Sequence, residues 1–317
     1  MKKITYLLVM AMAILIFATA CGNNSSLSNK DNSSDSGSGK DGYTPKELKV
    51  QFVPSQNAGT LEAKAKPLEK ILSKELNIPV KVSVSTNYNT IVEAMKSKQV
   101  DVGFLPPTAY TLAHDQKVAD LLLMAQRYGV NFDGSESKEL VKNYKSEIIV
   151  KKNSGINSLK DLKNKKIALQ EVTSTSGYTF PAATLKEKAG LDVTKDMKVI
   201  NVKGHDQAVI SLLNGDVDAA AVYQDARSLV KKDQPNVFKD TKIIKITEPI
   251  PNDTISVRSD MNKDFQEKLK QAFKNLAKTK EGHDIISEIY GHESYVEAQD
   301  SDFDIVRKYE KQVQDMK

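Results

Sequence analysis

Cysteine is almost absent from this 317-residue sequence, in which Cys21 is the only one. A chain with one thiol cannot form an internal disulfide, so the stability of its fold must come from core packing. The thiol itself needs an explanation, because an unpaired and exposed cysteine is open to oxidation.

Long apolar runs are also scarce. One lies at residues 6–18, between the positive pair Lys2 and Lys3 and the small residues Thr19 and Ala20. This pattern predicts a secretory signal peptide over residues 1–20. No later stretch approaches the roughly 18 apolar residues that cross a bilayer. We therefore expect the rest of the chain to lie in water on the extracytoplasmic side.

The position of Cys21 accounts for its presence. Residues 17–21 read Phe-Ala-Thr-Ala-Cys and resemble a bacterial lipobox, in which the cysteine receives acyl chains such as palmitate and becomes the new N-terminus. Ala18 departs from the usual Leu or Val, and the alternative is simple cleavage after Ala20. Two or more acyl chains hold a protein stably on a membrane. Residues 22–42 are dominated by Gly, Ser, Asn and Asp, so residues 21–43 are predicted to be a lipidated cysteine and a flexible tether.

Arginine-rich stripes and basic clusters with stacking aromatics are missing as well. Removing Lys2 and Lys3 from the 46 basic residues leaves 44 against 41 acidic ones, a mild excess. Nucleic-acid binding is therefore disfavoured. The sequence also lacks a nucleophile elbow, a Walker loop and the zinc-binding spacing His-Glu-x-x-His, which disfavours the corresponding enzymes and any metal cofactor.

What the sequence does contain is a regular alternation of strand and helix patterns. Alternating or short apolar runs predict strands at residues 48–53, 80–84, 102–105, 148–150, 166–169, 198–202 and 219–222. Apolar residues at helical spacing predict helices at residues 60–76, 90–98, 179–188, 207–213, 264–278 and 303–313. This order is typical of the α/β class, with parallel sheets covered by helices.

Two segments, residues 91–104 and 207–222, repeat the same helix–turn–strand pattern. Each ends in a small-residue strand that can deliver its following loop to a cleft, where open α/β sheets bind ligands. We expect two lobes, residues 44–148 with 251–317 and residues 149–250. The chain would cross between them near 147–151 and 248–253, and the C-terminal helices would pack on the first lobe.

The strongest local signal for a ligand lies at residues 170–181. A predicted strand ends at residue 169, three hydroxyl residues follow (Ser174, Thr175 and Ser176), and a predicted helix begins. Free N–H groups at a helix start attract anions, and the hydroxyls add donors for a tetrahedral oxyanion. A helix cap needs only one of these hydroxyls, so the run of three favours an anion site.

Several motifs in order resemble the phosphonate- and phosphite-binding proteins of ABC importers. They are residues 87–95 around Tyr88, 100–107, 144–150 beginning with Tyr144, 174–177, and 204–206 followed by 216–220. The resemblance implies a type II periplasmic-binding fold, two α/β lobes joined by a two-strand hinge. It also implies a phosphorus oxyanion ligand, a partner permease with its ATPase, a monomer and no cofactor. The implied ligand contacts are Tyr88, Tyr144, Ser174, Thr175, Ser176 and His205.

Each of these contacts has a chemical reason. The tyrosines can donate phenolic O–H bonds while their rings exclude water. His205 can donate to a phosphonyl oxygen and, as imidazolium, would offset negative charge. His114, His283 and His292 lack such a context and are expected at the surface. By position, Asp225 and Asp253 fall where some family members place acidic residues that recognise an amino group, so both are candidate ligand contacts.

Other functions remain open at this point. Ser174, His205 and Asp225 could form a hydrolytic triad, and a ligand-sensing partner of a membrane receptor would share the fold and the ligand. The same fold also serves phosphate, sulfonates, thiamine-type molecules and amino acids. Amino-acid sites commonly use an arginine for the carboxylate. The four arginines (Arg127, Arg227, Arg258 and Arg307) lie outside the matched motifs, which disfavours amino acids.

Overall fold

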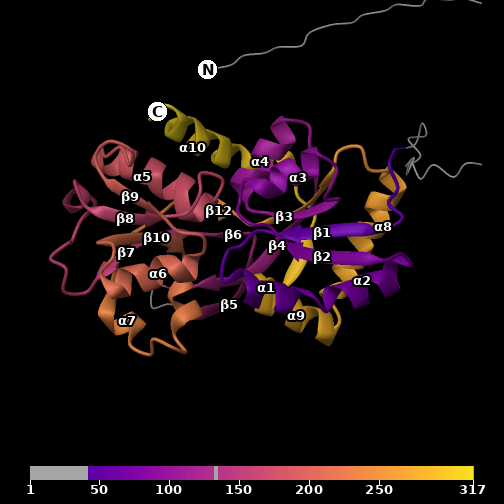
Figure 1. Cartoon of the computed structure of the whole chain (residues 1–317), viewed down its shortest axis with the longest axis horizontal. Helices are drawn as coiled ribbons and strands as arrows, with labels where there is room; N and C mark the ends of the chain where they lie inside the picture. Colours follow the sequence, from indigo (N-terminus) through magenta and orange to yellow (C-terminus); the bar gives the residue numbers. More distant parts are fainter. Residues whose placement is uncertain (1–41, 132–134, 317) are drawn as a thin grey trace, which may run out of the picture. The chain divides into compact units, whose positions relative to one another are not determined.

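The computed structural model describes residues 42–131 and 135–316, which form two α/β lobes (Figure 1). The predicted signal peptide, Cys21 and nearly all of the predicted tether lie outside these residues. Within the described ranges, no helix has both the length and the apolar character needed to cross a membrane.

The first lobe is built on a seven-stranded sheet. Its strand order is β14-β4-β13-β3-β1-β2, with β5 paired to β4. The strands are β1 (Leu48–Phe52), β2 (Val80–Val84), β3 (Val102–Leu105), β4 (Ala119–Val130), β5 (Glu136–Val141), β13 (Thr254–Arg258) and β14 (Ser294–Val296). Strands β2, β1 and β3 are parallel, whereas β13, β4, β14 and β5 join in antiparallel register. The sheet is therefore mixed, and the expectation of a parallel sheet holds only for its β2-β1-β3 part.

Helices cover both faces of this sheet because its strands bury apolar residues on both sides. One face packs against helices α1 (Ala58–Ala65), α2 (Leu68–Leu76), α8 (Lys263–Leu276) and α9 (Lys280–Tyr290). The other face packs against α3 (Thr90–Lys96) and α4 (Pro107–Asp115). At the centre of the first core, the rings of Phe52 and Phe104 stack with centroids 4.2 Å apart.

The prediction of one helix over residues 60–76 is wrong, because the structure contains the two helices α1 and α2 with a break at Pro67. Proline has no N–H for the helix and clashes with the preceding turn. Leu61, Ala65, Leu68 and Leu72 are nevertheless all buried, so the predicted apolar face survives the break.

The second lobe is a five-stranded sheet with the order β11-β7-β10-β8-β9. Its strands are β7 (Ser146–Lys151), β8 (Lys166–Leu169), β9 (Lys198–Asn201), β10 (Ala219–Tyr223) and β11 (Thr241–Ile246). Here β10, β8 and β9 are parallel, and β7 is antiparallel to both of its neighbours. Helix α5 (Phe180–Ala189) packs on one face of the sheet, and α6 (His205–Asn214) with α7 (Val237–Asp240) on the other.

Two short strands connect the lobes. Strand β6 (Asn143–Tyr144) pairs antiparallel with β12 (Ile250–Pro251), and Figure 1 shows both labels between the two sheets. The second crossing, β12, lies within residues 248–253. The first lies slightly earlier than residues 147–151, because β7 already belongs to the second sheet from Ser146 onward.

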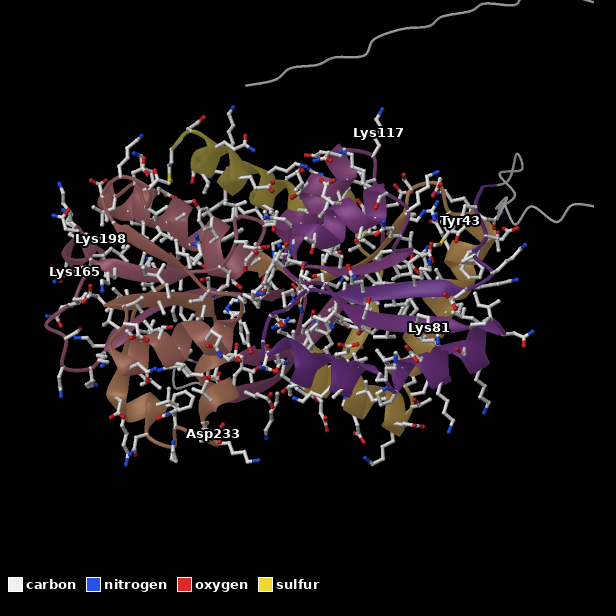
Figure 2. The ribbon with its side chains drawn as sticks, in the orientation of Figure 1. Tyr43, Lys81, Lys117, Lys165, Lys198 and Asp233 are labelled. Carbon is white, nitrogen blue, oxygen red and sulfur yellow. The ribbon has the colours of Figure 1, made fainter. Side chains whose placement is uncertain are left out.

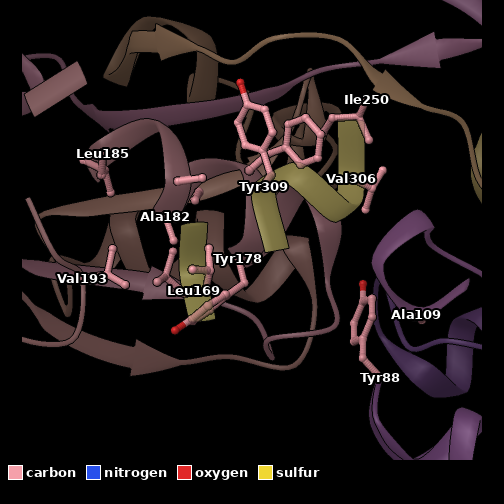
Figure 3. Close-up of a cluster of buried hydrophobic side chains, with 14 of the residues drawn as sticks. Tyr88, Ala109, Leu169, Tyr178, Ala182, Leu185, Val193, Ile250, Val306 and Tyr309 are labelled. Carbon is pink, nitrogen blue, oxygen red and sulfur yellow. The ribbon is translucent and has the colours of Figure 1, made fainter. Parts of the chain in front are cut away.

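The last helix, α10 (Asp304–Gln314), was expected to pack on the first lobe, and in the structure it packs on the second lobe as well. Its Tyr309 ring stacks on Phe180 of α5 in the second lobe, with centroids 4.3 Å apart. Its Glu310 carboxylate accepts a hydrogen bond from Thr111 Oγ1 of α4 in the first lobe, at 3.0 Å. Figure 3 shows Val306 and Tyr309 in the same cluster of buried side chains as Ala182 of the second lobe. Helix α10 therefore contacts both lobes.

Candidate ligand-binding site

A cavity of about 410 Å³ lies between the lobes. It is lined by all eight residues that the sequence singled out as ligand contacts: Tyr88, Tyr144, Ser174, Thr175, Ser176, His205, Asp225 and Asp253. These residues come from the first lobe, from the connecting strand β6 and from the second lobe. The fold thus collects in one place residues that lie up to 165 positions apart in the sequence.

The hydroxyl loop, which we define as Ser174, Thr175 and Ser176, follows the end of β8. Instead of entering an α-helix directly, the chain first makes a π-helical turn, η2 (Thr175–Thr179), which leads into α5. Such turns are rare and occur frequently at functional sites. Ser174 precedes this turn, but its side chain makes no capping hydrogen bond. The Ser174 hydroxyl therefore does not cap the helix, which was the structural alternative to ligand binding.

Bonds from the surrounding strands fix the hydroxyl loop. Ser146 Oγ of β7 donates to the Ser176 carbonyl at 2.6 Å, and Gln170 N donates to the Gly177 carbonyl at 3.1 Å. Ser174 is only 1 % exposed. A ligand at this loop would thus meet donors that are already ordered, which lowers the entropic cost of binding.

Tyr88 and Tyr144 bring phenol groups to the hydroxyl loop from outside the second lobe. Tyr88 directly precedes α3, and Tyr144 lies on the connecting strand β6. Burial raises the pKa of both phenols, and hydrogen bonds to Ser174 for Tyr88 and to Ser176 for Tyr144 oppose that rise. Both phenols therefore stay protonated at neutral pH and can donate to an anion.

His205 is the first residue of α6 and is 3 % exposed. Its Nδ1 accepts a hydrogen bond from the backbone N–H of Tyr223 at 3.3 Å, so we assign the ring proton to Nε2. Burial lowers the pKa of His205 to about 3. The ring is therefore neutral at physiological pH and can donate from Nε2, without the positive charge that an imidazolium would supply.

Asp225 is an aspartate in an unusual environment. Its backbone has φ = 70°, in the left-handed region that is costly for a residue with a Cβ, and such strain is concentrated at functional sites. Its Oδ2 accepts from Ser228 Oγ at 2.7 Å, whereas its Oδ1 is buried and lacks a partner among the described residues. Burial raises the pKa of the Asp225 carboxyl, and the Ser228 bond opposes this rise.

Asp253, in contrast, has a cation beside it. Arg127 Nη2 lies 3.4 Å from Asp253 Oδ2, and the Arg127 guanidinium lies 4.8 Å from the centroid of the Tyr144 ring. Arg127 lines the cavity, although no sequence motif singles it out from the four arginines. It lies within the long strand β4. Because an arginine does line the cavity, the absence of arginine from the matched motifs no longer disfavours amino-acid ligands.

His292 was expected at the surface, and this is wrong. It is 1 % exposed and lies behind Asp253, with Nε2 3.6 Å from Asp253 Oδ2 and its ring against Tyr290 and Tyr295. Burial lowers the pKa of His292, and the nearby Asp253 carboxylate opposes this effect. His114 and His283, with side chains 35 % and 39 % exposed, are at the surface as expected.

The suggested hydrolytic triad does not form in this geometry. In such a triad a carboxylate orients the histidine through the nitrogen that does not face the nucleophile. Here Nδ1 of His205 accepts from the Tyr223 amide instead, and Asp225 bonds to Ser228. Among the described residues there is also no group of three or more His, Cys, Asp or Glu side chains that could hold a metal ion. The arrangement is suited to holding an anion with neutral donors.

Solved structures of binding proteins share this two-lobed architecture. PhnD1 of Prochlorococcus marinus in complex with methylphosphonate is 23% identical, with a TM-score of 0.72, and the match covers 86% of this chain and 99% of that one. A binding protein component of an ABC phosphonate transporter from Pseudomonas aeruginosa is 20% identical, with the same TM-score, over 85% and 87% of the two chains. These matches confirm the predicted fold.

Sequence comparison agrees with the structural match. The phosphate-import protein PhnD of Mycolicibacterium smegmatis is 30% identical over 187 residues, which span 56% of this chain and only 56% of that protein. The probable phosphite-binding protein PhnD1 of Prochlorococcus marinus is 26% identical over 82% of this chain and 87% of that protein. A family model described as "ABC transporter, phosphonate, periplasmic substrate-binding protein" matches residues 50–303. The chain therefore belongs to the family of periplasmic substrate-binding proteins of ABC phosphonate transporters.

Proposed function

We propose that this protein is an extracytoplasmic lipoprotein that captures a phosphonate between its lobes and presents it to an ABC permease and its ATPase. The observation that carries the proposal is the set of neutral donors around one buried site. The hydroxyl loop, Tyr88, Tyr144 and His205 are all uncharged at neutral pH and line the same cavity.

This donor set suits a tetrahedral oxyanion. Three consecutive hydroxyls, two phenols and one imidazole N–H can reach several oxygens of a single –PO₃ group from different directions. Hydrogen bonds to an ionised acceptor are short and about twice as strong as neutral ones. They strengthen further where water is excluded, and the buried hydroxyl loop provides such a site.

The cavity has room for more than the oxyanion. At about 410 Å³ it is far larger than a five-heavy-atom oxyanion needs, and its lining continues past the hydroxyl loop to Gln224, Asp225 and Ser228. A buried carboxylate beside a bare phosphite or phosphate would repel it. The unpartnered Oδ1 of Asp225 instead suits an ammonium group, whereas Asp253 is already neutralised by Arg127. We infer that the preferred ligand is an aminoalkylphosphonate whose ammonium contacts Asp225.

We further infer that Cys21 carries the lipid anchor and that the protein acts as a monomer on the outer face of the cell membrane. Acylation of Cys21, with residues 22–42 as a tether, would keep the lobes near the permease while leaving them free to open. In cells labelled with a palmitate analogue, the protein should carry the label and Cys21→Ser should lose it. An unlabelled wild-type protein would refute the anchor without affecting the ligand proposal.

Isothermal titration of the protein from Gly42 onward tests the ligand. We expect tight binding of 2-aminoethylphosphonate, weaker binding of methylphosphonate, phosphite and phosphate, and rejection of sulfate. Alanine at Ser174, Thr175 and Ser176 together should abolish binding while leaving the circular dichroism spectrum unchanged. Asp225→Asn should remove the preference for the amine and keep methylphosphonate binding. If none of the phosphorus ligands binds, or if the triple variant binds normally, the proposal is wrong.

A further inference from the structure

A carboxylate of the second lobe holds backbone N–H groups of the first lobe next to the cavity. Glu171 follows β8, and its Oε2 accepts from Tyr88 N at 2.7 Å and from Asn89 N at 3.3 Å. Beside it, Thr173 Oγ1 donates to Asn89 Oδ1 at 2.7 Å. These bonds join residues of the first lobe to residues of the second, so they exist only while the lobes are in contact.

Glu171 is placed to act on the ligand contacts without touching the ligand. It does not line the cavity, but Ser174 lies three residues after it, and Tyr88, whose amide it holds, lines the opposite wall. The Tyr88 phenol and the Ser174 hydroxyl are close enough for the hydroxyl to oppose the rise in the pKa of the phenol. The Glu171 carboxylate therefore holds the backbone of Tyr88 next to the hydroxyl loop.

A second contact between the lobes closes another side of the cavity. The backbone N–H of His205 donates to the Ser55 carbonyl at 2.9 Å, and Asn57 N donates to Asp206 Oδ2 at 3.2 Å. The approach is close enough that a Cβ at Gly204 would lie 3.1 Å from the Cα of Gln56. One of these two bonds joins backbone to backbone, whereas both Glu171 bonds use a side chain that can be changed without altering the main chain.

We propose that Glu171 is a positioning residue that stabilises the closed form and thereby sets how long the ligand stays bound, without setting which ligand is preferred. Bonds from a carboxylate to backbone N–H groups are of the stronger, charge-assisted kind. If they are lost, a smaller fraction of the protein is closed, and the apparent dissociation constant of every ligand rises by the same factor. The proposal for the ligand-bound protein rests on the function proposed above.

The test compares Glu171→Ala and Glu171→Gln with wild type and with Glu187→Gln. Glu187 is a suitable control because it lies on α5 in the same lobe and pairs with the exposed Lys188. All proteins carry Cys21→Ser, so spin labels attach only at Lys81→Cys in the first lobe and Asp233→Cys in the second. Both positions are exposed and point outward (Figure 2). Double electron–electron resonance measures the distance between the two labels, and this distance reports lobe closure.

For Glu171→Ala we expect a larger open population and dissociation constants about tenfold higher for both 2-aminoethylphosphonate and methylphosphonate, with their ratio unchanged. The rise should come from faster dissociation, measured by stopped flow. Glu171→Gln keeps an acceptor oxygen and should lie between alanine and wild type. Glu187→Gln should behave as wild type.

Two results would overturn the proposal. Unchanged label distances and affinities in Glu171→Ala would mean that the bond does not stabilise closure, and a changed ratio of affinities would mean that Glu171 contacts the ligand. If Glu171→Ala fails to fold, Glu171→Gln provides the same comparison. If the wild type binds no phosphorus ligand, the proposed function fails, yet label distances in the unliganded proteins still decide the role of Glu171.

Discussion

Adding a single methyl group at Gly177 should disrupt the hydroxyl loop, because the group would clash with Gln170. A Cβ on Gly177 would overlap the carboxamide of Gln170 and lie 2.7 Å from Ser174 Oγ. Gln170 is fully buried, and its Nε2 donates to the Ala221 carbonyl at 3.4 Å. Its side chain therefore has no free space to move into, and Gly177→Ala must displace either Gln170 or the loop.

The size of the effect follows from two contributions. Overpacking a well-packed interior typically costs about 1–3 kcal/mol, and loss of the Gln170 hydrogen bond adds about 1 kcal/mol. We expect Gly177→Ala to lower the free energy of unfolding by about 3 kcal/mol and to weaken ligand binding through the displaced Ser174 hydroxyl. Gly59→Ala is the matched control, because the nearest atom to its added Cβ is Asn57 Oδ1 at an ordinary 3.6 Å. It lies in α1 and should be neutral or slightly stabilising.

Equilibrium urea unfolding, followed by circular dichroism, measures these changes if the slope of the transition stays constant. The clash requires both side chains, so Gln170→Ala should relieve it. The double variant should be more stable than the sum of the two single effects predicts, by about 2 kcal/mol, within the range for residues in contact. Additive effects, or a Gly177→Ala as mild as Gly59→Ala, would refute this reasoning.

Three further predictions concern charge. Burial raises the pKa of Glu310 to about 7, so the stability contributed by its protonated form is complete below about pH 4.5 and lost as pH rises through 7. Allowing for its partial exposure, Glu310→Gln should stabilise the protein by about 1–2 kcal/mol at pH 8 and by little at pH 5 in urea titrations. For His205, with its pKa lowered to about 3, the contribution is complete above about pH 6.5 and lost as pH falls toward 3. His205→Gln should therefore reduce the acid-induced loss of stability at pH 4 by about 2 kcal/mol, and an unchanged pH profile would contradict the neutral assignment. Arg127→Met leaves Asp253 without its cation beside the bound anion, so phosphonate affinity should fall at least about tenfold by titration calorimetry, and Asp253→Asn should restore part of it.

Much of the architecture could be predicted from local pattern. The strands β2, β3 and β8 have the predicted bounds, because each is a short alternating or apolar segment between turn residues. The antiparallel strands of both sheets could not be placed in the same way, since their register is decided by contacts between distant segments. The double role of α10 also escaped prediction, because an amphipathic pattern shows that a face is buried and not which lobe buries it.

The candidate site could also be predicted only in part. Its hydroxyl loop and His205 lie in the connections that follow β8 and β9, where sequence order alone indicates a position at the cleft. Arg127 and His292 reach the site from the middle of β4 and from the segment before β14, and only the folded chain brings them to Asp253. The neutral state of His205 could not be predicted, for a related reason. The ring is neutral because of how deeply it is buried, and burial depends on the lobes being closed.

The neutrality of the donors explains why contacts between the lobes should matter in this protein. A site built on cations attracts an anion even in an open, wet cleft, because Coulomb forces act over several ångströms. Hydroxyls, phenols and a neutral imidazole compete poorly with water until water is excluded. Their contribution is therefore realised only in the closed form, in which Tyr88 meets the hydroxyl loop. Any residue that stabilises closure, with Glu171 as the clearest case, then controls the affinity as strongly as a direct ligand contact does.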